Sequence, residues 1–250
     1  MRRAAFAALL IALAARSARA AAIAWNGGAA GDWFVAANWT PAAVPGAGDA
    51  VTIASGTVVA YSTDPALGVA SLTLGESGVV PPALLQISTG LAVAGTFLLR
   101  DGAALQVSTG ASVAAADISL LSGTSVAFLV APTTAGPAPF LRFYASGSFN
   151  LSGGSTITTR GRGYARGTGA AAGSGTGGGG AGSGSAGGGG GGLGGNGGSG
   201  GGAANFGAAF GVLLPADAGG GGGGSPSSNG GAGGGALRSE ERRVGKECRL

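Results

Sequence analysis

The sequence predicts an all-β protein, and within that class a β-solenoid whose successive coils stack their strands in parallel. Short β-rich runs alternate with Ser, Thr, Gly or Asp turns over residues 51–159. Two runs, LQISTG (85–90) and LQVSTG (105–110), are nearly identical and lie twenty residues apart. No long stretch shows the 3.6-residue hydrophobic period of a helix. A sandwich or a barrel would also contain many short strands, but the twenty-residue self-similarity favours the solenoid.

The composition is compatible with stacked coils. Glycine accounts for 57 of the 250 residues and charged residues for 10%, whereas average proteins contain about 7% glycine and about a quarter charged residues. In a solenoid, inward Leu, Val and Ile form one continuous core, while Gly and Ser occupy tight corners. Sheet stacking therefore explains the low charge better than membrane insertion does.

The net charge of +4 comes from the two ends of the chain. Residues 1–20 contain four arginines and no acid, and residues 238–250 contain five cations and three anions. The residues between them hold five arginines and seven acids. Because the body is slightly acidic, the sequence offers no basic patch for nucleic-acid phosphates.

Residues 1–20 have the three parts of a secretory signal peptide. Arg2 and Arg3 form the positive start, residues 4–15 form a twelve-residue apolar core, and a small-x-small sequence predicts cleavage after Ala20. The apolar core is shorter than the ~20 residues that span a bilayer, so a short membrane anchor is the weaker alternative. No second apolar stretch of spanning length follows. We therefore expect an exported protein, secreted or on the outer cell surface, with no transmembrane helix after signal removal.

Residues 21–50 contain all three tryptophans of the chain. We interpret this segment as an N-terminal cap, because the first coil of a solenoid has an unpaired edge that must be covered. The alternative is that Trp25, Trp33 and Trp39 stack on sugar rings and form a glycan-binding site.

Residues 51–159 form the predicted β-helix coils. Each coil contributes β-prone runs that end in turn residues. The runs are VTIASG (51–56), SLTLGESG (71–78), LQISTG (85–90), FLLRDG (97–102), LQVSTG (105–110), ISLLSG (118–123), SVAFLV (125–130), FLRFYASG (140–147) and FNLSGG (149–154).

Residues 160–237 are dominated by glycine. The segment contains too few large apolar side chains to offset the entropy lost on folding. We therefore expect a long glycine-rich, low-complexity and largely disordered insertion. One island, NFGAAFGVLLPADAG at 205–219, is the only part that we expect to dock on the coils.

The residues for most catalytic and metal chemistry are missing. The chain has no His, which excludes Ser–His and Cys–His catalysis. Its single cysteine, Cys248, leaves no disulfide or cysteine-type metal site. Calcium-binding glycine-rich repeats need an Asp in each nonapeptide, whereas the tract holds only Asp217. We therefore expect no cofactor and no metal site.

Paired carboxylates remain the one possible catalytic arrangement. Asp101 and Asp117 are sixteen residues apart, so a coil of about twenty residues would not place these two acids directly above one another. Turn capping is the simpler role for such aspartates, and we expect no enzyme active site in this chain. The acids considered are Asp32, Asp49, Asp64, Glu76, Asp101, Asp117 and Asp217.

A small basic group opens the glycine tract. Arg160, Arg162 and Arg166 flank Tyr164 and could contact anionic glycans. A solvated turn is the simpler interpretation.

Residues 238–250 differ in composition from the rest of the chain. They contain its only Lys, its only Cys and three of its four Glu. RSEERRVGKECR resembles the translation of a short-read sequencing adapter, whose AGATCGGAAGAGC start encodes Arg-Ser-Glu-Glu. We interpret this tail as an artefact, so that the native C-terminus is expected to be missing; the alternative is a real charged helix with i,i+4 pairs.

The run WNGGAAGDWFVAANWTPAAVPGAGDAVTI resembles the opening module of large exported bacterial β-helix proteins of the autotransporter or adhesin type. The run from STITTRGRGYARG through the glycine tract resembles the glycine-rich insertion of the same family. This resemblance implies a right-handed parallel β-helix with a structural or adhesive role at the cell surface. It also implies an anchor in the missing C-terminal part.

We therefore expect a secreted or cell-surface, adhesin-like β-helix fragment without catalysis of its own. Extracellular glycans or cell-surface material are the expected partners, and nucleic acid is not. The first alternative is the N-terminal fragment of a β-helix polysaccharide lyase or hydrolase. The second is a glycan-binding module that uses the Trp cluster.

Overall fold

The computed structural model describes residues 21–54, 58–61, 68–78, 82–108, 110–128, 140–160, 162–183, 187–192, 207, 220–233 and 236–241. These residues form an all-β fold built on parallel sheets, with one short 3-10 helix, η1 (Ala36–Asn38). The predicted all-β class is confirmed. The predicted signal peptide with its cleavage site at Ala20 lies outside the described residues, as does nearly all of the island at 205–219.

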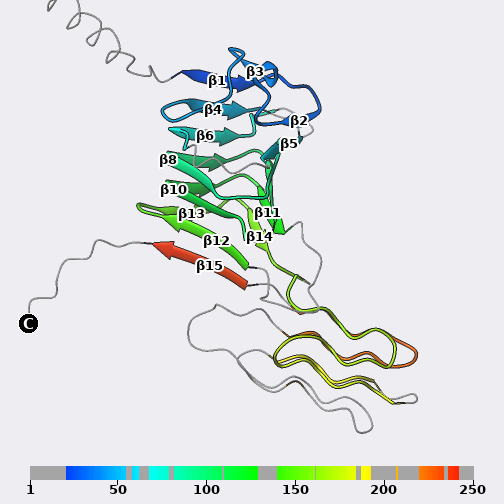
Figure 1. The fold of residues 1–250 in the computed structure, drawn as a ribbon. Helices are drawn as coiled ribbons and strands as arrows, with labels where there is room; N and C mark the ends of the chain where they lie inside the picture. The colour runs from blue at the N-terminus through cyan, green and yellow to red at the C-terminus, as the bar shows by residue number, and fades with distance from the viewer. Residues whose placement is uncertain are drawn as a thin grey trace, which may run out of the picture.

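The first sheet runs through most of the described chain in the order β15-β12-β10-β8-β6-β4-β1-β3, with β13 also paired to β10 (Figure 1). All its pairs are parallel except β1 with β3. Its strands are β1 (Ala22–Trp25), β3 (Trp39–Thr40), β4 (Ala50–Ile53), β6 (Ser71–Leu74), β8 (Leu91–Leu99), β10 (Ser112–Leu120), β12 (Phe140–Ala145), β13 (Phe149–Leu151) and β15 (Ala236–Glu241).

The second sheet is parallel throughout and has the order β14-β11-β9-β7-β5-β2. Its strands are β2 (Ala30–Asp32), β5 (Val58–Tyr61), β7 (Leu84–Ile87), β9 (Ala104–Val107), β11 (Ser125–Phe128) and β14 (Thr156–Thr158). Along the chain from β4 to β11, successive strands therefore fall alternately in the first sheet and in the second.

The repeated sequences occupy neighbouring strands in the second sheet. Leu85 pairs with Leu105 and Ile87 pairs with Val107, so the twenty-residue sequence repeat equals one step of this sheet. Between them, Gln86 Nε2 donates to Gln106 Oε1 at 2.8 Å on the opposite face. Other steps are longer, and 31 residues separate Ser125 from its partner Thr156. The twenty-residue period is therefore the shortest step between paired strands, and longer loops lengthen the others.

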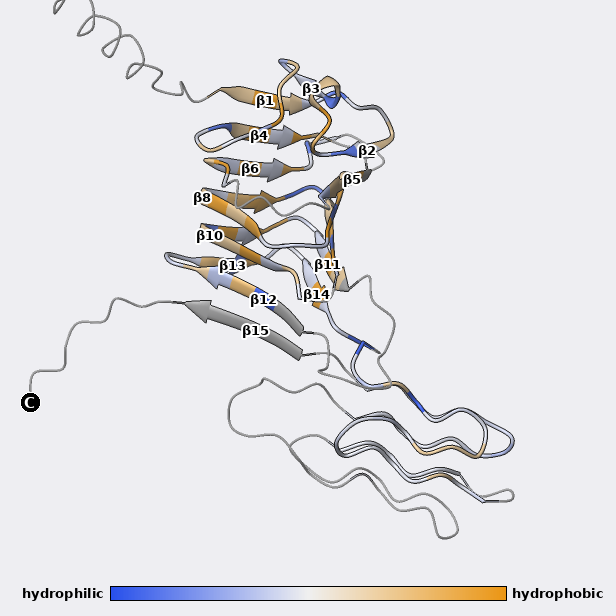
Figure 2. Cartoon of the chain, in the orientation of Figure 1, coloured by the Kyte–Doolittle hydropathy of each residue, from blue (hydrophilic) through white to orange (hydrophobic). Residues whose placement is uncertain are grey.

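The core lies between the two sheets and consists of aligned aliphatic and aromatic rows. In the first sheet, Ile53, Leu74, Leu99 and Leu120 are successive register partners, and all four are fully buried. Residues alternate between buried and partly exposed along each of these strands, as β-strand geometry requires. Figure 2 shows the hydrophobic positions distributed along the strands of both sheets. Burial of these rows supplies the main driving force for folding.

One β-bulge interrupts the longest pairing. The register between β8 and β10 shifts between Ala115 and Asp117, from an offset of 22 residues at Leu91–Val113 to 21 at Thr96–Asp117. A bulge places an extra residue on one strand and turns the following side chains. Asp117 directly follows this irregularity.

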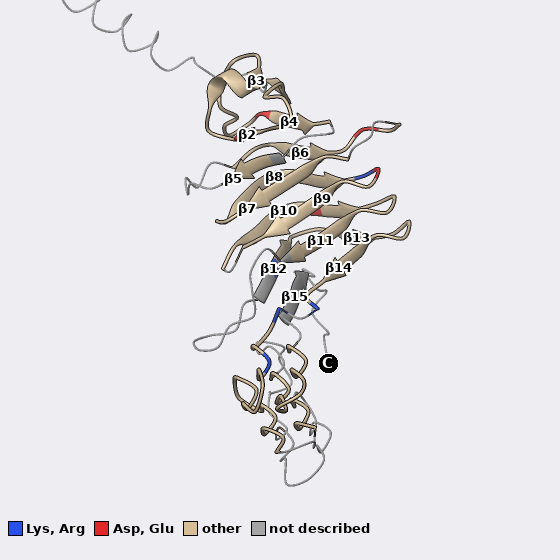
Figure 3. Ribbon diagram, turned by 90° about the vertical axis from the view of Figure 1, so that its right-hand side faces the viewer, with Lys and Arg blue, Asp and Glu red and all other residues tan. Residues whose placement is uncertain are grey.

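The described part of the glycine tract is held by backbone hydrogen bonds. We expected residues 160–237 to be largely disordered, but the described part forms extended segments joined by backbone hydrogen bonds. Examples are Gly167 N to Gly222 O (2.8 Å), Gly179 N to Gly221 O (2.9 Å) and Gly189 N to Gly180 O (2.9 Å). Figure 3 shows these segments running close together beyond the ends of the two sheets.

The physical reason for this order is the absence of a Cβ atom. A Cβ placed on Gly221 would overlap the Ala165 carbonyl, and one placed on Gly223 would overlap the Gly180 carbonyl. The backbones therefore approach more closely than any other residue would allow, and their polar groups satisfy one another. Apolar side chains are few in this tract, and close backbone contacts stabilise its described segments instead.

The predicted artefact at 238–250 is partly described. The backbone of β15 pairs in parallel with β12, from Phe140–Ala236 to Ala145–Glu241. Residues 238–241 thus extend the first sheet, although the tail was excluded from the expected fold. The rest of the tail lies outside the described residues.

Candidate functional site

The Trp segment folds into a compact aromatic cluster. Trp33 and Trp39 are each 1% exposed, with ring centroids 4.8 Å apart in an edge-to-face arrangement. Trp39 Nε1 donates to the Trp33 carbonyl at 2.7 Å, which satisfies the buried indole. Tyr61 of β5 packs edge-on against Trp33 at 5.3 Å. Two of the three predicted glycan-stacking residues therefore have rings enclosed by protein.

Trp25 is the third predicted residue and remains partly exposed. Its ring packs edge-on against Trp39 at 4.9 Å, and its Nε1 donates to the Gly28 carbonyl at 3.3 Å. Gly27 lies directly beneath it, because a Cβ there would be 2.5 Å from Trp25 Cζ2. Trp25 is the only one of the three Trp rings with surface left for a ligand.

The same segment covers the first edge of the first sheet. β3 pairs antiparallel with β1 through Trp25–Trp39 and Ala24–Thr40. β1 thus has strand partners on both sides, β4 on one and β3 on the other. This is the arrangement expected of a cap, since an uncovered long edge favours association with other chains.

Asp49 joins the start of the described chain to β4. Its Oδ1 accepts a hydrogen bond from the Ala21 backbone nitrogen at 3.1 Å, and its Oδ2 accepts one from Gly46 N at 2.8 Å. Its carbonyl also accepts from Ala70 N at 2.8 Å. The sequence predicts only a turn-capping role for Asp49, and nothing in the local sequence indicates its contact with Ala21.

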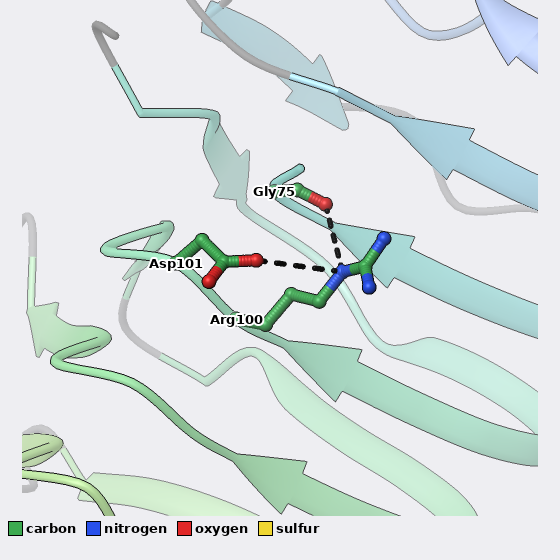
Figure 4. Close-up of polar contacts among 3 residues, drawn as sticks. All are labelled: Gly75, Arg100 and Asp101. Carbon is green, nitrogen blue, oxygen red and sulfur yellow. Dashed lines mark hydrogen bonds and ion pairs between the residues drawn. The ribbon is translucent and has the colours of Figure 1, made fainter. Parts of the chain in front are cut away.

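An ion pair lies at a corner after β8 (Figure 4). Arg100 Nε is 3.7 Å from Asp101 Oδ2 and donates to the Gly75 carbonyl at 3.2 Å. The two side chains are 42% and 27% exposed, so solvent screens the pair and it adds little stability. Its role is to tie the corner to the neighbouring turn at Gly75.

Asp117 caps a turn rather than facing a second acid. Its Oδ1 accepts from Ser148 N at 2.9 Å and from Ser148 Oγ at 2.7 Å. The Ser148 hydroxyl, followed by the Ser148 amide, lowers the pKa of Asp117 below its ordinary value. These bonds hold the turn between β12 and β13 against β10.

Asp101 and Asp117 do not form a catalytic pair. Asp117 pairs with Thr96, which precedes Asp101 by five residues along the chain. β8 ends at Leu99, three residues after Thr96, and Asp101 lies in the turn beyond that end, so the strand alone separates the two positions by about 10 Å. Paired carboxylates of glycoside hydrolases lie about 5–10 Å apart, and here Asp117 is hydrogen-bonded to Ser148 while Asp101 faces Arg100. The two acids therefore act independently of each other.

The basic group around Tyr164 leads into the glycine tract. Tyr164 O accepts from Gly233 N at 2.9 Å, and Gly163 N donates to Gly233 O at 2.8 Å. The Tyr164 ring lies so close to Gly175 that a Cβ there would overlap it. Tyr164 thus packs inside the tract, while Arg160 and Arg166 are exposed.

Two further features bear on the expected partners. The part of the chain that the structure describes has no group of three or more His, Cys, Asp or Glu placed to hold a metal ion. In the same residues no helix is long and apolar enough to cross a membrane.

No protein-family model, curated protein or solved structure matches this chain.

Proposed function

We propose that this chain is an exported surface protein with a structural or adhesive role, built as a right-handed parallel β-solenoid and without catalysis of its own. The observation that carries the proposal is the alternation of consecutive strands between two parallel sheets. β6, β8 and β10 lie in the first sheet, while β7, β9 and β11 lie in the second. A chain that visits two parallel sheets in turn and advances one strand each time follows the path of a solenoid.

The proposed handedness follows from the chirality of strand connections. Crossovers between parallel strands of one sheet are right-handed in about 98% of cases. Each coil here makes such a crossover by way of the other sheet. The resemblance of the Trp segment and of the glycine tract to exported bacterial β-helix proteins supports the same handedness.

The proposed structural or adhesive role rests on the outer faces of the strands. Ala22, Ala50 and Ser71 are aligned across the first sheet, and Gln86 and Gln106 are aligned across the second. These positions are small or uncharged, and Figure 3 shows few charged residues over either sheet. Regular, uncharged surfaces of this kind suit extended contact with other surfaces more than they suit chemistry.

Glycan binding at Trp25 is a second candidate function. It is favoured by one observation, the partial exposure of this ring beside two buried ones. The edge-to-face contact with Trp39 fixes the orientation of the Trp25 ring, and a sugar could stack on the exposed part of that ring.

One experiment tests both functions on the full chain produced in a bacterial host. Protease shaving of intact cells should remove the protein, and cells that carry it should adhere to a glycan-coated or bare surface more than control cells do. A protein retained inside intact cells contradicts the export proposal. Adhesion lost in Trp25→Ala but kept in Trp25→Phe assigns the binding to the exposed ring, whereas adhesion unchanged in both assigns it to the sheets.

A further inference from the structure

The first described residue is held by a carboxylate far from it in the sequence. Ala21 N lies 3.1 Å from Asp49 Oδ1, across 28 residues of chain. Ala21 packs against the core, and Ala50 N donates to the Ala21 carbonyl at 2.9 Å. The position of Ala21 is therefore fixed by hydrogen bonds at both its backbone nitrogen and its carbonyl oxygen.

The Asp49 carboxylate is fixed in place independently of Ala21. Gly46 N donates to Asp49 Oδ2 at 2.8 Å, and Asp49 N donates to the Gly46 carbonyl at 3.1 Å. These bonds close a small loop that aims the other oxygen at Ala21. Because the carboxylate is already ordered, it loses little conformational entropy when a donor binds.

The charge pattern leaves this carboxylate without a cationic partner. Residues 21–99 contain four acidic side chains and no Lys or Arg. Arg100, the first cation after this segment, pairs with Asp101. Any positive charge near Asp49 must therefore come from elsewhere.

We propose that cleavage after Ala20 creates this positive charge, and that the new α-ammonium group of Ala21 pairs with Asp49 to lock the first strand onto the second. The inference rests on the proposed export of the chain. A signal peptidase hydrolyses the Ala20–Ala21 peptide bond with water, which leaves a carboxylate on Ala20 and an amino group on Ala21. That amino group takes a proton from solvent at neutral pH.

The lock replaces an amide–carboxylate hydrogen bond with an ammonium–carboxylate ion pair at the same atoms. The amide N–H of the uncleaved chain and the ammonium of the cleaved chain would both donate to Asp49 Oδ1. The amide bond has one ionised partner, the carboxylate, whereas the ammonium bond has two and adds the attraction between opposite charges. Processing would thus strengthen the seam between β1 and β4 once the leader has been removed.

Few other groups could titrate at this place. The strands packed around β1, namely β3 and β4, contain no titratable side chain, and β6 beyond them contains none. Asp32, the other acid of the cap, accepts a hydrogen bond from Phe34 N at 2.8 Å. Asp49 is the one charged group in contact with the Ala21 nitrogen.

The lock predicts a defined pH dependence. An opposite charge at this distance raises the pKa of an amino group above its ordinary ~7.7–8.0. A group whose pKa is raised in the folded state adds stability below its unfolded pKa, and that stability is lost as pH rises through the folded pKa. The processed protein should therefore lose this contribution on the alkaline side of neutrality.

The chain is well suited to measuring this pKa. After processing it carries two amino groups, that of Ala21 and that of Lys246, the only lysine. The full chain is exported, its N-terminal mass is determined, and both amines are reductively methylated with a ¹³C label for NMR titration. We expect an Ala21 midpoint at least about one pH unit higher in the wild type than in Asp49→Asn, with an unchanged Lys246 midpoint.

A second variant covers the case in which Asp49→Asn does not fold. Two glycines inserted between Ala21 and Ala22 retain Asp49 and the cleavage site but move the amino group away from the carboxylate. Its Ala21 midpoint should also fall by about one pH unit. Cleavage after Ala20 with equal midpoints in all chains overturns the lock alone, whereas cleavage elsewhere or no cleavage overturns both the lock and its basis in export.

Discussion

Single residues decide how sharply the chain turns at one set of corners. Asp101 and Gly102, Ser122 and Gly123, and Gly153 and Gly154 all have positive φ angles between 55° and 78°. Gly102 N donates to Ser122 O at 3.0 Å, and Gly123 N donates to Gly153 O at 2.8 Å, so the three turns stack. Most residues with a Cβ atom adopt this left-handed region at a cost of about 1–2 kcal/mol, whereas Gly, and to a lesser degree Asn and Asp, tolerate it.

Alanine substitutions at the last of these corners should separate conformational strain from steric overlap. At Gly154, with φ of 78° and open space around it, alanine should cost about 1–2 kcal/mol. At Gly153, with φ of 65°, a Cβ would also lie 2.7 Å from Ser122 N, so Gly153→Ala should be the more destabilising. Chemical denaturation of both variants measures the difference. If both variants lose the same free energy of unfolding, the steric overlap at Gly153 is relieved by a local shift and the prediction is wrong.

At the scale of the element, the two faces of one strand have different roles. β9 buries Leu105 completely between the sheets and directs Gln106 outward to Gln86. The near-identical sequences of β7 and β9 alternate apolar and polar residues, so the inward and outward positions can be predicted from the sequence. The bulge in β8, where Ala94 and Gly95 lie opposite Ala116, could not be predicted from the sequence, because it depends on how β8 aligns with β10.

Substitutions on the two faces of β9 should therefore have unequal effects. Leu105→Ala removes a fully buried side chain and leaves a cavity, at an expected cost of about 2–5 kcal/mol. Gln106→Ala, its matched control, removes one partly exposed hydrogen bond at an expected cost of about 0.5–1.5 kcal/mol. Urea unfolding followed by far-ultraviolet circular dichroism gives both values. A larger loss for Gln106→Ala would contradict the inward direction of Leu105.

For the whole molecule, the glycine tract and the sheets are held together by different forces. The sheets bury one continuous cluster of apolar side chains. The tract relies on backbone hydrogen bonds between closely spaced segments, such as Gly223 N to Gly189 O at 2.8 Å. Because these bonds lie outside an apolar core, the tract should open before the sheets do.

A Cβ atom should disrupt the tract only where the segments are in contact. Gly223→Ala would place a Cβ against the Gly180 carbonyl, whereas at Gly187 nothing lies within 4 Å of the added atom. Hydrogen exchange with mass spectrometry should show faster exchange across residues 162–183 in Gly223→Ala and no change in Gly187→Ala. The sheets should keep their protection in both. Equal exchange in the two variants would mean that the tract is not packed in this way.

Sequence patterns alone determined the all-β class, the inward aliphatic positions and the turns. These features are local: strand alternation has a period of two, and turn residues act within four positions. The sequence also separated the Trp segment and the glycine tract from the coils. It did not indicate that the tract would be ordered, because that order comes from close backbone approach between distant segments.

Only the tertiary structure decided which distant residues meet. It enclosed Trp33 and Trp39 and left Trp25 partly exposed, although the three look alike in the sequence. It separated Asp101 from Asp117 along the strands, and it brought Ala21 to Asp49. Such contacts depend on the register between strands and on the lengths of the loops that join them. No local pattern encodes these, because many chain segments with the same hydrophobic period can pair in more than one register.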